Sequence, residues 1–348
     1  MTHELKTGGD RGYLRIATEE AFGPQEMFAK YREILQGPDV DPGFRSLWGF
    51  FLEADSGYTN STVQRLIDIG ERRIADMDAT GIDVQLLSLT APGVQVLDTA
   101  TARSLAVMSN DRVAEACRDF PDRFAALTAI PPQDPAFAAK ELERGMTKLG
   151  LKGAIINSHT QGEYLDQTKF WPIFEAAEAL DAAIYIHPQT LPHPAGQQFV
   201  DRNLDLAIMG FAVEVAFHTL AIIVSGAFDR FPRLKIVIGH GGEGLPFWIY
   251  RMDYMQDVIF GRKPGTRRIK HKISHYLRNN IWITTSGMAW EPAISFTQQV
   301  LGFDRVLYAM DYPYQYDAGE VRVSDNLPIS AANKKKFYQT NAQRVFNL

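Results

Sequence analysis

The chain is poor in cysteine, since Cys117 is the only one among its 348 residues. A disulfide within the chain is therefore impossible, and we expect the protein to work in a reducing cytoplasm. We interpret Cys117 as a small apolar residue on a helix rather than as a nucleophile. A large excess of one charge is also lacking, because the formal net charge is −5 and is dispersed along the chain. This argues against partners such as nucleic acid or an anionic membrane surface.

Long apolar runs are equally scarce. Residues 1–12 are polar and predict no signal peptide. The stretch from Leu206 to Phe228 approaches the length of a membrane span, which is about 20 residues. It contains Glu214 and His218, and no second stretch of this kind accompanies it. We therefore expect a buried helix here and no membrane segment.

Short apolar runs rich in β-branched residues recur along the chain. Each is continuous rather than alternating, which is typical of parallel strands buried on both faces. The expected strands are Leu14–Thr18, Val84–Leu89, Phe124–Ile130, Gly153–Asn157, Ala183–Ile186, Lys235–Gly239, Ile281–Thr285 and Val306–Met310. Other segments place apolar residues at helical spacing. The expected helices are Thr62–Thr80, Ala100–Asp119, Pro135–Leu149, Phe170–Leu180, Leu204–Phe228, Leu245–Val258, Pro292–Leu301 and Ala331–Phe346.

Strands that alternate with helices in this way predict an α/β fold, a closed (β/α)8 TIM barrel. The alternative is a doubly wound open sheet, which would normally carry a glycine-rich phosphate turn after an early strand. The first strand leads instead into Glu19 and Glu20, so we favour the barrel. We expect one domain over residues 1–348, with insertions at the C-terminal face and the largest at about 31–59. Its aromatic cluster, Trp48 to Phe51, is expected to meet a partner chain.

Polar and ionisable side chains follow five of the expected strands. They are Glu19 with Glu20, Ser158 with His159, His187, the segment His240–Glu243, and Asp311. The C-terminal ends of barrel strands meet at one rim, where barrel enzymes build their sites. Charges buried there cost desolvation energy, which metal binding offsets. We predict that Glu19, His187 and Asp311 bind a divalent metal, because one imidazole and two carboxylates suit Zn, Mn or Fe and leave room for substrate.

Two more groups lie after the sixth expected strand. Glu243 is three residues from His240 across a Gly-Gly turn, so its carboxylate can orient the imidazole. We predict that His240 faces the substrate as an acid/base or polarising group; the structural alternative, in which Glu243 caps the following helix, is compatible with this. Arg251 lies further along that helix, and its planar guanidinium suits a carboxylate or a phenolate. A surface charge cluster of Arg251 with Asp253 is an equally good interpretation.

Several motifs together resemble the amidohydrolase superfamily over nearly the whole chain, and specifically its metal-dependent branch of aromatic decarboxylases. They are Ile16-Ala17-Thr18-Glu19-Glu20-Ala21-Phe22, Leu87-Ser88-Leu89-Thr90-Ala91-Pro92-Gly93-Val94-Gln95, Tyr185-Ile186-His187-Pro188, Gly239-His240-Gly241-Gly242-Glu243-Gly244-Leu245-Pro246, Thr284-Thr285-Ser286-Gly287 and Met310-Asp311-Tyr312-Pro313-Tyr314. Within the branch, Lys6–Arg15, Ser46–Phe50 and Asn157–Gly162 resemble the 5-carboxyvanillate decarboxylases, whereas the γ-resorcylate decarboxylases are more distant.

The resemblance implies a divalent metal, Mn2+ in the first place and Zn2+ in the second, and no organic cofactor. It implies the same three ligands, because Ala21 stands where some relatives carry a further histidine. It also implies a small aromatic carboxylate as substrate, whose contacts we assign to Arg251, Thr90, His159, Phe211, Tyr316 and Tyr58. Tyr58 stands where 5-carboxyvanillate enzymes place an arginine for a substrate carboxylate, and tyrosine carries no positive charge at neutral pH.

The implied reaction is the non-oxidative decarboxylation of an ortho-hydroxy aromatic carboxylate, namely 5-carboxyvanillate or a close analogue. Direct loss of CO2 would leave an aryl anion in the ring plane, so protonation of the ring carbon should come first. We expect Asp311 to deliver that proton, while His240 held by Glu243 polarises the phenolic oxygen. A metal-dependent hydrolase of the lactonase type is the alternative on the same scaffold. A homodimer or homotetramer is the expected assembly.

Overall fold

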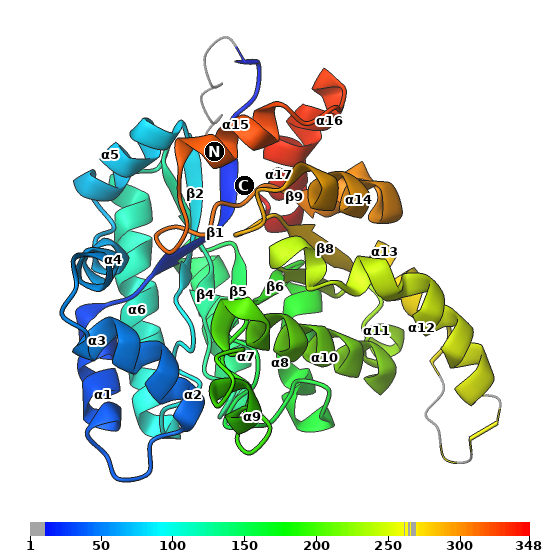
Figure 1. The fold of residues 1–348 in the computed structure, drawn as a ribbon, viewed down its shortest axis with the longest axis horizontal. Helices are drawn as coiled ribbons and strands as arrows, with labels where there is room; N and C mark the ends of the chain where they lie inside the picture. Colours follow the sequence, from blue (N-terminus) through cyan, green and yellow to red (C-terminus); the bar gives the residue numbers. More distant parts are fainter. Residues whose placement is uncertain (1–10, 261, 264, 266–268) are drawn as a thin grey trace.

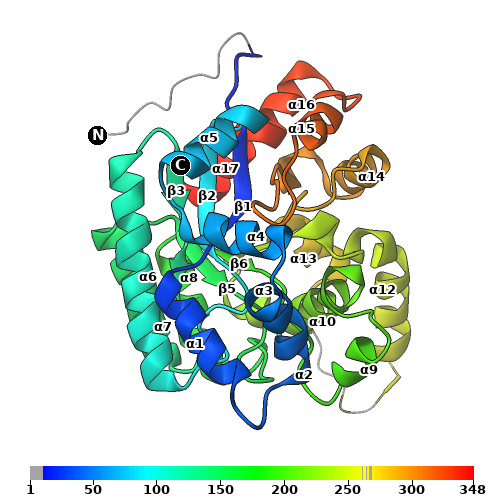
Figure 2. The same ribbon diagram turned by 60° about the vertical axis from the view of Figure 1, so that its left-hand side comes forward.

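Strands occupy the centre of the molecule and helices surround them (Figure 1, Figure 2). The computed structural model describes residues 11–260, 262–263, 265 and 269–348. The polar start of the chain up to residue 10, including the part of the opening motif over residues 6–10, lies outside the described residues.

The strands form two parallel sheets that together make up a barrel. One sheet contains β1 (Ile16–Phe22), β2 (Val84–Leu89) and β3 (Phe124–Ala126). The other contains β4 (Thr128–Ala129), β5 (Gly153–Ile156), β6 (Ala183–Ile186), β7 (Lys235–Ile238), β8 (Ile281–Thr284) and β9 (Val306–Leu307). Every pair of neighbouring strands is parallel, as the continuous apolar runs predict.

Backbone hydrogen bonds close the two sheets into one barrel. Strands β3 and β4 are separated by Leu127 alone, whose N–H donates to the carbonyl of Leu87 in β2 at 2.8 Å. They therefore fill one position, the single strand that the sequence predicts at Phe124–Ile130. On the far side, the N–H of Thr18 in β1 donates to the carbonyl of Tyr308 just after β9 at 3.1 Å. The prediction of a (β/α)8 TIM barrel is confirmed.

The first strand differs from its prediction in a way that matters for the site. It spans Ile16–Phe22 rather than Leu14–Thr18. Its register against β2 shifts between Ala17 and Glu20, which marks an extra residue and a local change of direction. Glu19 and Glu20 therefore lie inside the strand, 3% and 0% exposed, instead of following it. A strand buried on both faces has no alternation from which its end could be read.

The helices lie around and between the strands. Their bounds are α1 Gln25–Leu35, α2 Pro42–Phe44, α3 Phe50–Glu53, α6 Thr99–Asp119, α7 Pro135–Lys148, α8 Trp171–Ala179, α9 Gln197–Val200, α12 Leu245–Phe260, α13 Ile273–Asn279, α14 Glu291–Leu301, α15 Ala318–Asp325, α16 Ala331–Lys335 and α17 Asn341–Phe346. The predicted helix Thr62–Thr80 is two helices, α4 (Gly57–Ile67) and α5 (Glu71–Thr80). It breaks where the Asp68 carboxylate accepts the N–H of Gly70 at 3.0 Å.

The predicted helix Leu204–Phe228 is also divided. A 3-10 turn at Leu206–Ile208 precedes α10 (Gly210–Ser225), and α11 (Ala227–Arg230) follows. Gly226, at φ +85°, ends α10 in the left-handed conformation that glycine adopts without strain. In the described part of the chain, no helix is long and apolar enough to cross a membrane.

The insertion after β1 packs its aromatic side chains into the main hydrophobic core. Trp48 and Phe51 are 0% and 7% exposed, and the ring of Trp48 lies 5.0 Å from that of Tyr31. Trp48 Nε1 donates to the carbonyl of Ala91 at 3.1 Å, which docks the insertion on the loop after β2. Trp48 and Phe51 therefore do not form an exposed patch, whereas Phe50 is 49% exposed. Contact of the Trp48–Phe51 cluster with a partner chain stays a prediction. Helices α1 to α4, blue in both views, gather on one side of the molecule (Figure 1, Figure 2).

Candidate metal centre

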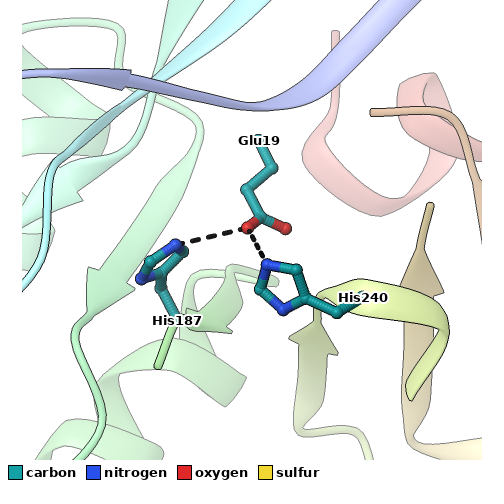
Figure 3. Close-up of side chains that lie close together, drawn as sticks. All are labelled: Glu19, His187 and His240. Carbon is teal, nitrogen blue, oxygen red and sulfur yellow. Dashed lines mark ion pairs between the residues drawn. The ribbon is translucent and has the colours of Figure 1, made fainter. Parts of the chain in front are cut away.

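Three side chains from distant strands converge at one end of the barrel. Glu19 belongs to β1, His187 follows β6 directly, and His240 is the first residue of the turn η5 (His240–Gly242) after β7. The Nε2 atoms of both histidines lie 3.3 Å from Glu19 Oε1. Figure 3 shows the carboxylate directed between the two imidazole rings. The ligand atoms of the three residues all lie within 4.8 Å of one another, and no other such group exists among the described residues.

The outer nitrogen of each ring is already engaged. His187 Nδ1 donates to the carbonyl of Pro188 at 2.7 Å, and His240 Nδ1 donates to the Glu243 carboxylate at 2.7 Å. A carbonyl and an ionised carboxylate only accept, so the hydrogen of a neutral ring sits on Nδ1 and Nε2 presents a lone pair. While both rings are neutral, two nitrogen lone pairs and the oxygen of Glu19 therefore face one another, which is favourable only with a positive charge between them, either a bound metal cation or a proton on one ring.

The carboxylate of Glu19 is held by one oxygen and free at the other. Oε2 accepts hydrogen bonds from the hydroxyls of Tyr185 and Thr284, the latter at 3.0 Å. Oε1 is buried and has no hydrogen-bond partner in the described part of the chain. A buried, unpaired carboxylate oxygen is costly unless a cation binds it. Two imidazoles and a carboxylate are the donor set of Mn2+, Zn2+ and Fe2+ sites, so these residues fit a divalent metal.

Sequence reasoning missed Tyr185 and Thr284. Both lie inside strands that read as plain apolar runs, and both are fully buried. A hydroxyl in a buried strand needs a hydrogen-bond partner, and that requirement is the signal by which they could have been found.

The charges around Glu19, His187 and His240 favour one positive charge at this position. Burial alone would raise the pKa of Glu19, but His240 and His187 more than offset it and hold that pKa below its usual range. Burial lowers the pKa of His187. Burial also opposes the charged form of His240, but Glu19 and Glu243 outweigh it and raise the pKa of His240 well above its usual range. A proton on His240 therefore balances the carboxylates in the metal-free chain, and a bound divalent cation would take over that task.

Asp311 lies beside this group. Its backbone is left-handed, with φ at +71°. Its Oδ2 and the Cδ2 of His240 lie 3.3 and 3.7 Å from the point where a Cβ on Gly287 would stand, so both side chains border the same gap. Burial raises the pKa of Asp311 well above its usual range, and the charge of Glu19 adds to this. Asp311 is not a member of the three-residue group, and its roles as ligand and acid stay predictions.

Thr90 and Tyr58 meet at Tyr314, which sequence reasoning did not select. The Tyr314 hydroxyl lies 2.5 Å from Thr90 Oγ1, and its carbonyl accepts a long hydrogen bond from the Tyr58 hydroxyl at 3.5 Å. Its ring packs against Phe51 at 5.5 Å. Burial, with a contribution from the charge of Asp311, raises the pKa of Tyr314. These contacts join the insertion and the loop after β2 to the segment that follows Asp311.

Tyr316 and Phe211 are placed differently. The ring of Tyr316 lies 4.8 Å from that of Tyr312, and the guanidinium of Arg65 lies over it at 5.4 Å, so Tyr316 contacts α4. Phe211 is in the first turn of α10 and packs, partly buried, against the main hydrophobic core. Their contacts with substrate stay predictions.

His159 is buried with both ring nitrogens in use. Nε2 faces the carbonyl of Thr190 at 2.9 Å, and Nδ1 accepts the N–H of Gly162 at 3.1 Å. Burial lowers the pKa of His159, in agreement with a neutral ring. His159 therefore has no ring nitrogen left for a substrate hydrogen bond while these contacts persist. It lines a separate cavity of about 370 Å³ with Gln189 and His193.

Arg251 is an exposed residue of α12. With Glu243 it lines a cavity of about 460 Å³ between α10 and α12, whose other walls are apolar. The Asp253 carboxylate accepts hydrogen bonds from the N–H and the hydroxyl of Ser274, at 3.0 and 2.5 Å. Asp253 is thus engaged elsewhere, which weakens the alternative of an Arg251–Asp253 cluster.

Comparisons with known proteins identify the family of the chain. A family model described as amidohydrolase matches residues 58–348. The chain is 50% identical to 5-carboxyvanillate decarboxylase of Novosphingobium aromaticivorans, and the structures superpose with a TM-score of 0.96 over 99% of this chain and 100% of that one. That structure contains manganese and 3-methoxy-4-hydroxy-5-nitrobenzoic acid.

Two further relatives extend the comparison. The chain is 40% identical to 5-carboxyvanillate decarboxylase of Sphingomonas paucimobilis, with a TM-score of 0.90 over 96% of this chain and 99% of that one. It is 37% identical to γ-resorcylate decarboxylase of a Polaromonas species over 96% of this chain and 98% of that protein.

Proposed function

Because the chain belongs to the amidohydrolase family, and within it to the metal-dependent decarboxylases of aromatic carboxylates, we propose that it removes CO2 from 5-carboxyvanillate or a close ortho-hydroxy analogue. The observation that carries the proposal is the convergence of His187 Nε2, His240 Nε2 and the unpaired Oε1 of Glu19. We propose Mn2+ as the metal and Zn2+ as the second choice, because manganese is present in a structure 50% identical to this chain.

Glu19, His187 and Asp311 are the proposed ligands, and His240 lies as close to Glu19 as His187 does. Metal content decides between His240 and Asp311 as the third ligand. If Asp311 is the ligand, His240→Ala should keep most of its manganese; if His240 is the ligand, Asp311→Asn should keep it instead. His187→Ala should lose metal in both cases, and full occupancy in that variant would refute the ligand assignment.

When bound, the metal supplies positive charge that stabilises the carboxylate and phenolate oxygens of the substrate. The residues of the chain do the remaining work. Glu243 holds the imidazole of His240 toward the phenolic oxygen, and Asp311 holds the proton that the ring carbon receives. Protonation at that carbon breaks the aromaticity, and cleavage of the C–C bond to CO2 restores it. This order avoids an aryl anion in the ring plane.

Asp311→Asn tests the acid assignment, because the amide keeps the shape of the side chain but delivers no proton. We expect kcat to fall by at least about 100-fold, within the range that a general acid contributes. The assay follows the ultraviolet absorbance of the Mn2+-loaded protein with a panel of ortho-hydroxybenzoates, and CO2 is measured as the product. Asp304→Asn is the control, since Asp304 pairs with Lys336 at the surface. A wild-type rate in Asp311→Asn would refute the assignment.

The CO2 measurement also addresses the hydrolase alternative. A lactonase would open a ring with uptake of water and release no CO2. No feature of the site favours this second activity, and the relatives named above are decarboxylases.

The ring substituents of the substrate depend on Tyr58. 5-Carboxyvanillate carries a second carboxylate, whereas Tyr58, which is 54% exposed, offers a hydroxyl and no charge. We propose that Tyr58 binds this substituent through a single hydrogen bond and that analogues with a neutral group there are also accepted. Tyr58→Phe should raise KM for such analogues more than it lowers kcat.

A homodimer or homotetramer is the proposed assembly. Exposed aromatic side chains gather on α12, namely Phe247, Trp248, Tyr250 and Tyr254, with exposed fractions of 70, 51, 81 and 59%. Apolar patches of this kind usually meet a partner. We also propose the cytoplasm as the compartment, because Cys117 has no second cysteine to pair with.

A further inference from the structure

We propose that Glu20 is a positioning residue that acts through Asp311. The two carboxylate oxygens of Glu20 accept the backbone N–H groups on either side of Asp311, from Met310 at 2.9 Å and from Tyr312 at 3.2 Å. Glu20 is 0% exposed, so the bonds form without competition from water. One carboxylate therefore grips the backbone immediately before and immediately after the proposed acid.

The backbone at Asp311 needs such a grip. Its φ of +71° places a residue with a Cβ in the left-handed region, where side chain and backbone crowd each other. A residue persists in this conformation only when its surroundings fix it. The grip of Glu20 is reinforced by the N–H of Ala21, which donates to the carbonyl of Tyr312 at 2.7 Å. Without Glu20, the backbone at residue 311 is free to relax and to turn the carboxylate away from the gap beside His240.

A buried guanidinium supports Glu20 from behind. Arg73 is 0% exposed and donates to Gln85 Oε1 at 3.2 Å, while Gln85 Nε2 donates to Glu20 Oε2 at 3.4 Å. Arg73 also donates to the carbonyl of Ala21 at 2.7 Å and lies over the ring of Tyr312 at 4.4 Å. Burying a carboxyl group and a guanidinium together costs desolvation free energy. Their hydrogen bonds hold both chain segments that define the orientation of Asp311.

The local shape of β1 explains why two adjacent acids do different work. Successive side chains of a strand point to opposite sides, and the extra residue between Ala17 and Glu20 changes the local direction of the strand. Glu19 faces the two histidines, and Glu20 faces the segment after β9. The two adjacent carboxylates of β1 therefore serve different groups: Glu19 belongs to the metal site, and Glu20 holds the backbone of the proposed acid.

Glu20→Gln tests this inference, which rests on the proposed function of Asp311 as proton donor. Glutamine has one carbonyl oxygen, so at least one of the two N–H groups loses its acceptor. We expect kcat, measured with excess Mn2+, to fall about 10- to 100-fold, as for an acid misplaced by about 1 Å, with KM close to wild type. Manganese affinity should fall as well if Asp311 is a metal ligand, and should stay at the wild-type value if His240 is the third ligand. Glu141→Gln is the matched control: Glu141 is 3% exposed and accepts from Asn110 and Arg144 away from the site. It should keep its kcat. If Glu20→Gln does not fold, Glu20→Asp, which keeps both oxygens at a shorter reach, takes its place.

A double-mutant comparison separates this inference from the proposed function. If Glu20 acts through Asp311, Glu20→Gln combined with Asp311→Asn should be no slower than Asp311→Asn alone. Multiplied losses in the double variant, a wild-type kcat in Glu20→Gln, or an equal kcat loss in Glu141→Gln would each overturn the inference. A wild-type rate in Asp311→Asn alone would instead refute the acid assignment, and it is measured independently of Glu20.

Discussion

Gly239→Ala asks whether the carboxylate of Glu19 must stay where it lies in order to hold a metal. Gly239 precedes His240, and a Cβ built there would lie 2.6 Å from Glu19 Oε2 and 3.2 Å from Oε1. Ordinary contact begins at 3.4 Å, so Oε2 would have to retreat by about 0.8 Å to relieve the repulsion. Tyr185 and Thr284, which bind that same oxygen, resist the movement.

The expected loss follows from the shortness of metal bonds. Metal–oxygen bonds of about 2.0–2.2 Å tolerate deviations of about 0.2 Å. The retreat of about 0.8 Å concerns Oε2, but both oxygens belong to one rigid carboxylate, so the metal-facing Oε1 must move with it and beyond this tolerance. We therefore expect the affinity for Mn2+ to fall about 10- to 100-fold. This corresponds to about 1.4–2.7 kcal/mol of binding free energy. The fold should survive, because overpacking of this kind costs about 1–3 kcal/mol of unfolding free energy.

The affinity of the variant is measured by titrating the metal-free protein with Mn2+. Its thermal stability and its decarboxylation rate are then measured as well. Gly57→Ala is the control, because a Cβ at the first position of α4 meets nothing within 4 Å. It should bind Mn2+ like the wild type, and excess Mn2+ should restore part of the rate of Gly239→Ala. Wild-type affinity in Gly239→Ala would mean that the position of Glu19 does not govern metal binding.

Two further predictions concern the buried Glu214 and the partly buried Cys117, neither of which belongs to the metal centre. Burial raises the pKa of Glu214 from 4.5 to about 8 in the folded chain. Between these values the folded state keeps a proton that the unfolded state has lost, so stability falls as pH rises, by up to about 1.4 kcal/mol per pH unit. Glu214→Gln stays neutral at every pH. Its free energy of unfolding in urea should therefore rise relative to that of the wild type between about pH 5 and about pH 7.5. A difference in unfolding free energy that is independent of pH would show that Glu214 is ionised when folded. Burial raises the pKa of Cys117 to about 12, so a thiol reagent at neutral pH should label unfolded but not native protein, and rapid native labelling would contradict this.

The barrel and the outline of its centre can be read from the sequence because both follow from chain periodicity. Strands buried on both faces leave continuous apolar runs, and a histidine directly after such a run must lie at the C-terminal rim. His187 and His240 were found in this way. The burial of Trp48 within the chain could not be predicted, because aromatic residues in an insertion give the same pattern whether they face a partner or pack, as Trp48 does, on Tyr31 and the loop after β2.

The remaining site residues could not be predicted from the sequence, because irregular backbone determines the direction of their side chains. Tyr314 and Tyr316 stand two residues apart after the left-handed Asp311, and sequence reasoning selected Tyr316 where the structure brings Tyr314 to Thr90. In a regular strand, residues with this spacing would share a face. The bulge in β1 has the same effect on Glu20, because no periodicity predicts which neighbour a carboxylate meets after an extra residue.

Polar residues follow both β5 and β6, but only those after β6 belong to the candidate metal centre. At the end of β5, the Ser158 hydroxyl donates to Glu214 at 2.6 Å and lies 2.8 Å from His218 Nδ1, whose Nε2 accepts the N–H of Leu165. Burial raises the pKa of Glu214 and lowers that of His218 to about 3, so both groups are neutral near pH 7 and need no ion. At the end of β6, His187 and Glu19 cannot neutralise each other by a hydrogen bond, because their facing atoms are both lone pairs. Both strand ends are buried, so burial does not distinguish them. At the end of β5 each facing pair of polar atoms shares a hydrogen, whereas at the end of β6 the facing atoms share none and require a cation.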